Sequence, residues 1–83
     1  MHYVYALYSK DFNKIYIGYS SDVNRRLESH NHKNNTHWTS KFQPWIIIYT
    51  EEHEIKAMAM KREKQLKSER GRQFIRGIIE KKY

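Results

Sequence analysis

The chain has 83 residues, which suffices for one small domain, expected to span residues 1–83, and not for two. It contains no cysteine, so the sequence excludes disulfides, thiolate zinc sites and a thiol nucleophile. Sixteen Lys and Arg residues outnumber nine Asp and Glu, and the resulting net charge of +7 favours an anionic partner such as nucleic acid.

The apolar segments of the chain are short. None approaches the ~20 residues that a membrane-spanning helix needs, and the N-terminus lacks the pattern of a signal peptide. No predicted helix combines a clean apolar face with a basic one, which disfavours binding to a membrane surface. We therefore expect a soluble, cytoplasmic protein with no membrane partner.

Two strands are predicted at the start of the chain. Residues 2–9 are aromatic and aliphatic without a breaker, and period-two alternation places Tyr3, Tyr5 and Leu7 on one face. Residues 10–13 are turn-like, and residues 14–19 form the second strand of an antiparallel hairpin. On this second strand, Tyr16 and Gly18 share a face, and the glycine permits close approach of another group.

A helix is predicted from about residue 22 to residue 30, after an N-cap signal at residues 20–22. At 100° per residue, Arg26 and His30 lie about 40° apart and flank the apolar stripe, whereas Arg25 points to solvent. Taken alone, each residue is explained equally well by a structural role. Arg26 could extend its charged end to solvent at the edge of the core, and His30 could be a hydrogen-bonded histidine of the helix.

The second half of the chain predicts a strand and two helices. Residues 30–39 form a polar loop, and the apolar run 45–50 predicts a strand buried on both faces. A helix over 54–67 has an apolar stripe of Ile55, Met58, Ala59 and Leu66. Gly71 marks a break before a last helix over 72–81, whose buried stripe is Phe74, Ile75, Ile78 and Ile79. The fold class is therefore α+β, with a small three-stranded antiparallel sheet flanked by helices in the order β-β-α-β-α-α.

Charged residues on the helix over 54–67 lie close to its apolar stripe. Glu63 lies on the shoulder of the stripe and has Lys67 available as an ion-pair partner at i+4. Arg62 lies nearer the middle, where either snorkelling or an ion pair would explain it.

Five blocks of this sequence resemble the GIY-YIG nuclease domain, and more closely its small stand-alone bacterial members. Tyr3-Val4-Tyr5 corresponds to the first motif and Tyr16-Ile17-Gly18 to the second. The other three blocks are residues 21–31, which resemble the family's arginine-bearing helix, residues 38–45, which resemble the loop before the third strand, and residues 59–67, which resemble the glutamate-bearing helix. The blocks stand in the family's order and cover essentially the whole chain.

The resemblance implies a metal-dependent DNA endonuclease that hydrolyses phosphodiester bonds, with a structure-selective role in repair or recombination as one interpretation. The residues that take the catalytic positions are Tyr5, Tyr16, Arg26, His30 and Glu63. Glu63 would bind the ion, Mg²⁺ or Mn²⁺, and Tyr5 is the first candidate for the general base, with His30 as the alternative proton acceptor.

The sequence departs from the family pattern at three places. Tyr3 stands at a glycine position, Tyr19 follows the second motif, and residues 73–80 lack the asparagine that the family often has in its last helix. These departures keep a second hypothesis open, a non-catalytic nucleic-acid-binding module with the same fold. A third is a protein-interaction domain with a basic surface. The oligomeric state stays open.

Overall fold

The computed structural model describes residues 1–82, one residue short of the predicted domain of 1–83, and its element order confirms the predicted β-β-α-β-α-α succession. A short 3₁₀ helix is added in the segment that we expected to be a loop. The elements are β1 (His2–Ser9), β2 (Lys14–Ser20), α1 (Val23–Asn31), η1 (Trp38–Phe42), β3 (Ile46–His53), α2 (Lys56–Lys67) and α3 (Glu69–Lys82).

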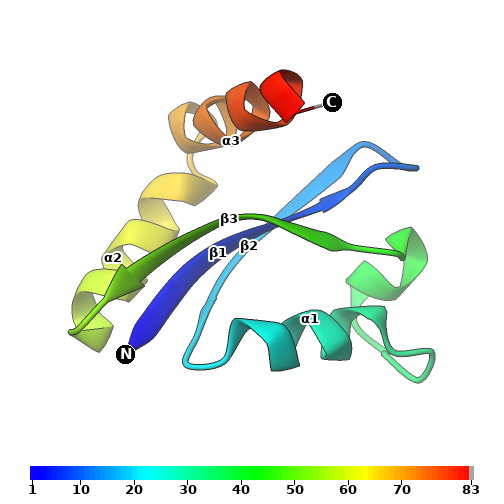
Figure 1. Cartoon of the computed structure of the whole chain (residues 1–83), viewed down its shortest axis with the longest axis horizontal. Coiled ribbons are helices and arrows are strands. Elements are labelled where there is room, and N and C mark those ends of the chain that lie inside the picture. The colour runs from blue at the N-terminus through cyan, green and yellow to red at the C-terminus, as the bar shows by residue number, and fades with distance from the viewer. Residues whose placement is uncertain (83) are drawn as a thin grey trace.

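The strands form one antiparallel sheet in the order β2-β1-β3, which confirms the predicted sheet. The helices flank it on two sides, with α1 and η1 on one and α2 and α3 on the other (Figure 1). Because β1 lies in the middle of this three-layered arrangement, residues 4–9 are all buried, whichever face their side chains take.

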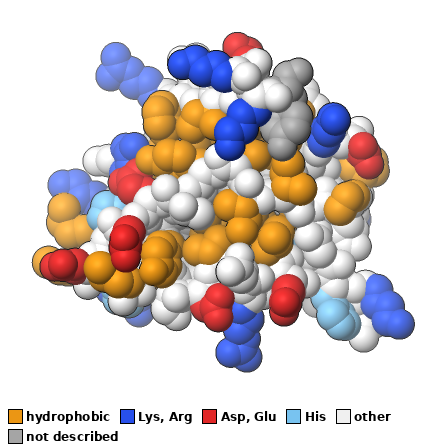
Figure 2. Space-filling view, in the orientation of Figure 1, with side chains coloured by type: hydrophobic (Ala, Val, Ile, Leu, Met, Phe, Trp, Pro, Cys, Tyr) orange, Lys and Arg blue, Asp and Glu red, His pale blue; other side chains and the backbone are white. Residues whose placement is uncertain are grey.

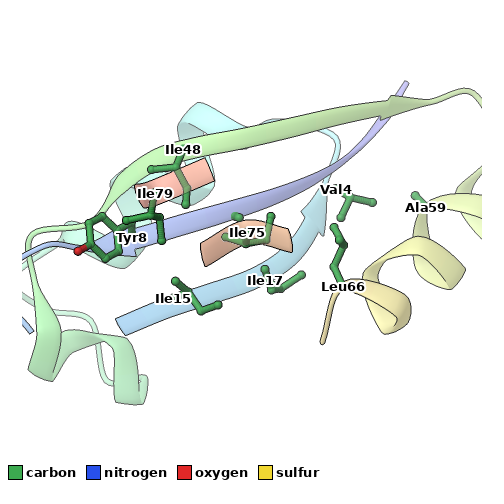
Figure 3. Packing of buried hydrophobic residues seen from close by; sticks show 10 residues of the cluster. Val4, Tyr8, Ile15, Ile17, Ile48, Ala59, Leu66, Ile75 and Ile79 are labelled. Atoms are coloured by element: carbon green, nitrogen blue, oxygen red, sulfur yellow. The ribbon is translucent and has the colours of Figure 1, made fainter. Parts of the chain in front are cut away.

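Alternation along the strands divides the core into two clusters. Under α2 and α3, the larger cluster contains Val4, Ala6, Tyr8, Ile15, Ile17, Ile48, Ala59, Leu66, Ile75 and Ile79 (Figure 3). On the α1 side, the smaller cluster contains Tyr5, Leu7 and Trp45, with Tyr16 and Leu27 among the partly buried residues packed against it. Tyr5 and Tyr16 of the predicted site therefore lie on the face of the sheet with the smaller core, whereas Glu63 belongs to α2, which covers the larger core.

Local signals explain where several elements begin and turn. The Asp22 side chain caps α1 by accepting a hydrogen bond from the Arg25 backbone N–H at 3.1 Å, which confirms the predicted N-cap. Asn13 closes the β1–β2 turn with φ of 53°, a left-handed conformation that asparagine tolerates better than most residues. Arg76 of α3 donates to the side-chain and backbone oxygens of Asn13, which ties the last helix to the hairpin.

The predicted stripes of the last two helices are only partly correct. Ala59 and Leu66 of α2 are buried, but Ile55 is 62% exposed and Met58 is 51% exposed. On α3, Ile75 and Ile79 are buried, whereas Phe74 is 47% exposed. Each helix covers the larger core with a narrow line of residues, because a three-stranded sheet offers little area for a wide apolar face.

Two local predictions in the second half of the chain were wrong. The strand over 45–50 is not buried on both faces, because β3 is an edge strand whose Ile46 and Thr50 are exposed. Gly71 does not break the helix but lies inside α3, and the break falls at Ser68. A Cβ at Gly71 would lie 2.3 Å from the Leu66 Cα and 2.4 Å from the Gln65 carbonyl oxygen, so the missing side chain lets α3 start directly against α2.

Charged side chains of both signs lie around the edge of the face shown in Figure 2. In the view of Figure 2, hydrophobic side chains gather over the middle of this face, and Lys and Arg side chains project mainly around its rim. Among the described helices, none is long and apolar enough to cross a membrane.

Candidate active site

Gly18 and Tyr5 lie opposite each other on β2 and β1, and the tyrosine ring occupies the space where Gly18 has no side chain. A Cβ added at Gly18 would lie 2.6 Å from the Tyr5 hydroxyl oxygen and 2.8 Å from Tyr5 Cζ. The same atom would lie 3.1 Å from Cε1 of Tyr16. The glycine is therefore needed for space at this position, and its φ is not positive.

Arg26 on α1 lies close enough to Tyr5 for the two side chains to influence each other. Interaction with the Tyr5 hydroxyl is the main reason why the pKa of Arg26 is raised, with smaller contributions from Tyr16. Tyr5 is fully buried, and burial raises its pKa even though Arg26 acts in the opposite direction. Tyr5 is therefore a protonated phenol at neutral pH, which weakens its candidacy as general base and suits it to hold the guanidinium.

Tyr16 is half-buried and lies at the centre of a group of rings. Its ring centroid is 6.3 Å from that of Tyr5, 4.6 Å from that of His30 and 6.0 Å from that of His37. The Trp38 ring lies 5.9 Å away on the remaining side. Of the two motif tyrosines, Tyr16 is the one that solvent reaches.

His30 is buried and neutral. Burial first, and then the positive charge of Arg26 and the proximity of His37, lower its pKa to about 4. Its Nδ1 is 2.9 Å from the Thr39 hydroxyl, which also accepts a hydrogen bond from Asn35 Nδ2 at 2.9 Å. The hydroxyl proton of Thr39 is then available to Nδ1, which favours the tautomer with the proton on Nε2. That Nε2 is buried and has no hydrogen-bond partner among residues 1–82.

Glu63 lies on α2, close enough to Tyr5 for its charge to raise the pKa of that phenol. Its carboxylate forms the predicted i,i+4 ion pair with Lys67 at 3.3 Å, and its side chain is 17% exposed. Within the described part of the chain, no group of three or more His, Asp or Glu side chains could hold a metal ion together. A lone carboxylate fits Mg²⁺, which keeps most of its waters and binds through one or two carboxylates.

Comparison with known proteins assigns this chain to a family. The family profile described as the GIY-YIG catalytic domain matches residues 1–76. The chain belongs to the GIY-YIG family. UPF0213 proteins of two Staphylococcus aureus strains, Mu50 and N315, are each 35% identical to it over 80 residues, which is 96% of either chain.

A solved relative supports the same assignment. The solution NMR structure of a UPF0213 protein from Bacillus halodurans is 32% identical in sequence and aligns with a TM-score of 0.55. The alignment covers 93% of this chain and 83% of the other. The resemblance expected from the motifs is thereby confirmed, and GIY-YIG domains are generally nucleases.

The GIY-YIG motifs come together as a group. The structure places Tyr5, Tyr16, Arg26 and His30 in one continuous set of contacts on the α1 side of the sheet, with Glu63 within electrostatic range of Tyr5. Their individual roles stay predictions.

Sequence reasoning missed the residues that support this GIY-YIG site. Asn31 donates to the Trp45 carbonyl at 2.9 Å and accepts from its N–H at 2.6 Å, which fixes the end of α1 to the residue preceding β3. Gln43 Nε2 donates to the carbonyls of His30 and His32 at 2.8 and 2.9 Å. The sequence feature that could have indicated these supporting residues is the high number of Asn and Gln side chains in residues 31–43, since such side chains commonly cap helix ends.

Arg62 is explained by the second of its two predicted alternatives, an ion pair. Its Nε donates to both carboxylate oxygens of Glu51 on β3, at 3.1 and 3.0 Å. Burial opposes the charge on Glu51, but hydrogen bonds from Tyr49 and Arg62 keep the pKa of the carboxyl below its usual value. This pair connects α2 to the sheet one residue before Glu63.

Proposed function

We propose that this protein is a cytoplasmic metal-dependent endonuclease that hydrolyses DNA phosphodiester bonds, with structure-selective cleavage in repair or recombination. The observation that carries the proposal is the packing of Tyr5 against Gly18 beside the accessible Tyr16, with Arg26 and the Glu63 carboxylate within electrostatic range of Tyr5. A cation can stabilise the charge that develops on a phosphate, a phenol can orient water, and a carboxylate can bind a divalent ion, so these groups suit metal-dependent phosphodiester hydrolysis.

Arg26 is the residue that stabilises charge. Its guanidinium is exposed to solvent, so a phosphate can reach it, while Tyr5 holds it in one orientation. The planar fork of arginine suits the oxygens of a phosphate whose negative charge grows in the transition state.

Tyr16 is assigned to the attacking water. A residue that orients or deprotonates water must meet solvent, and Tyr16 does so whereas Tyr5 is fully buried. His30 is a weak base because its pKa is about 4, so it stays neutral and packs against the Tyr16 ring rather than acting as the proton acceptor.

Glu63 would hold the ion, Mg²⁺ or Mn²⁺, through its carboxylate. When bound, such an ion supplies Lewis-acid polarisation of a phosphate oxygen and charge neutralisation at the leaving oxygen. The protein's own contribution is to keep Glu63 near Tyr5 through α2, which the Glu51–Arg62 pair fixes to the sheet.

The test is a nicking assay on supercoiled, branched and single-stranded DNA with Mg²⁺, with Mn²⁺ and with EDTA. Arg26→Ala should lose ~10²–10³-fold in rate, the usual consequence of removing one transition-state donor. Glu63→Gln should abolish the metal-dependent cleavage, while Arg25→Ala, which changes an exposed arginine on the same helix as Arg26, should retain it. Failure of wild type to cleave any substrate, or full activity of Glu63→Gln, would refute the proposal.

One observation favours a second function, a nucleic-acid-binding module without turnover. Residues 73–80 contain no asparagine, although the family often carries one in the last helix. Salt-dependent binding to DNA combined with no cleavage under any metal condition would support this second function.

A further inference from the structure

A row of aromatic side chains leads away from Tyr16 across the protein surface. Trp38 lies 5.9 Å from Tyr16, Phe42 lies 5.8 Å from Trp38, and Phe12 lies 5.5 Å from Phe42, all between ring centroids. We call Trp38, Phe42 and Phe12 the aromatic row. It joins the β1–β2 turn to η1 and ends beside the candidate catalytic tyrosine.

The outer members of the aromatic row are exposed in a way that core packing does not require. Trp38 is 46% exposed and Phe12 is 49% exposed, while Trp45, which contacts Trp38 from below, is only 1% exposed. The ring contacts within the row are edge-to-face, at 67° and 72°, so each ring is held in place by its neighbour. The row is therefore a preformed aromatic surface with two exposed rings, Trp38 and Phe12.

Positive charge beside the aromatic row favours an anionic ligand. Lys14 Nζ lies 5.5 Å from the centroid of the Phe42 ring, and Lys41, next to Phe42 in η1, is exposed. Rings that stack on bases, interleaved with cations that meet the backbone, are what proteins use to bind single-stranded nucleic acid. A base paired within a duplex has no free face to offer, so an unpaired base is required.

We propose that the aromatic row binds unpaired bases of a DNA strand next to the scissile phosphate, which makes the substrate a duplex with a single-stranded tail or flap. The inference rests on the proposed nuclease function and names its substrate class. A stacked strand advances ~3.4 Å per nucleotide, so Trp38 would meet a base about two nucleotides from the phosphate at Tyr16.

The experiment measures binding by fluorescence anisotropy in EDTA, where the proposed reaction does not proceed. The probes are a labelled blunt duplex and the same duplex with a five-thymidine tail. Wild type should bind the tailed duplex about 5- to 150-fold more tightly, the range expected from one stacked base. Trp38→Leu should remove this preference and leave binding to the blunt duplex within about twofold, whereas Trp38→Phe should retain part of it.

Phe74 supplies a matched control. It lies on α3, is 47% exposed and makes one edge-to-face contact, with Tyr49 at 5.5 Å, so it resembles Phe12 in everything but position. Phe12→Leu should weaken the preference for the tail and Phe74→Leu should not. Because Trp38 also contacts Trp45, circular dichroism must show that Trp38→Leu is folded. The comparison of Phe12→Leu with Phe74→Leu tests the inference without changing Trp38.

The outcomes separate this inference from the proposed function. Equal affinity of wild type for both probes, or a preference that survives Trp38→Leu and Phe12→Leu, would overturn the inference, even if the blunt duplex is cleaved with Mg²⁺. A dimer in sedimentation that Trp38→Leu dissociates would also overturn it, because the row would then be a contact between copies of the chain. If the wild-type protein binds neither the blunt nor the tailed duplex, both proposals are refuted.

Discussion

Gly18→Ala provides the sharpest test of how the site is built. The new methyl carbon would lie 2.6 and 2.8 Å from two atoms of Tyr5, distances that real Cβ atoms essentially never show, so the phenol has to move. Tyr5 is fully buried on the central strand, so its ring can move only if neighbouring core residues also shift. Overpacking of this kind typically costs ~1–3 kcal/mol of folding free energy.

The expected results are a lower stability and a larger loss of cleavage. A domain of this size loses roughly 4–8 °C of Tm per kcal/mol, which thermal unfolding followed by circular dichroism resolves easily. Displacing Tyr5 also disturbs its interaction with Arg26, so the cleavage rate should fall by ~10²-fold or more at temperatures where the variant is still folded.

Gly77→Ala is the matched control. It makes the same chemical change, but a Cβ at Gly77 meets nothing within 4 Å, and the position lies inside α3. Alanine should stabilise the helix there by up to ~1 kcal/mol and leave cleavage unchanged. If Gly18→Ala matches Gly77→Ala in both Tm and cleavage, the glycine does not serve to accommodate Tyr5, and the reasoning fails.

Three further predictions concern charged groups. Since the pKa of His30 is about 4 in the folded protein and about 6.5 when unfolded, the unfolded chain takes up the proton first as pH falls. Lowering the pH from about 7 to 4.5 should therefore destabilise wild type by ~2–3 kcal/mol more than His30→Gln in urea denaturation, and an equal loss in both proteins would contradict this. Arg62→Ala should cost ~1–2 kcal/mol because it removes both hydrogen bonds from Nε to the partly buried Glu51 carboxylate, whereas Lys67→Met removes a single 3.3 Å contact of a 49% exposed lysine with Glu63 and should stay within ~0.5 kcal/mol in the same assay. Lys67→Met should also tighten Mn²⁺ binding about twofold in an electron paramagnetic resonance titration, since an i,i+4 pair worth ~0.3–0.5 kcal/mol no longer competes for Glu63, and unchanged or weaker binding would argue against Glu63 as the ligand.

Local patterns predicted the features of this fold that depend on neighbouring residues. Alternation in residues 2–9 and 14–19 predicted the hairpin, and the cap at Asp22 predicted where α1 begins. Helical spacing correctly placed Arg26 and His30 on the side that meets the sheet. Each of these depends on periodicity or capping, which a short window of sequence contains in full.

Features that depend on contacts distant along the chain were not predictable in the same way. Thr39 is nine residues from His30, and Glu51 is eleven residues from Arg62, so no helical or strand spacing relates them. The α2 stripe failed for a related reason: Met58 lies at a suitable angle, but the narrow sheet gives it nothing to cover. Packing area and loop path, which only the assembled fold defines, decide these cases.

The two motifs that define the family form one physical unit in this structure. The glycine of the second motif makes room for the tyrosine of the first, because Gly18 and Tyr5 are paired across the β1–β2 hairpin. The tyrosine in turn lies beside Arg26, and its burial raises the pKa of the hydroxyl. Tyr16, beside this unit and partly exposed to solvent, is the tyrosine that we propose orients the attacking water. Replacing Gly18 should therefore lower the cleavage rate mainly by disturbing Arg26, through Tyr5. A double-mutant cycle between Gly18→Ala and Arg26→Ala should show strongly non-additive losses of cleavage rate.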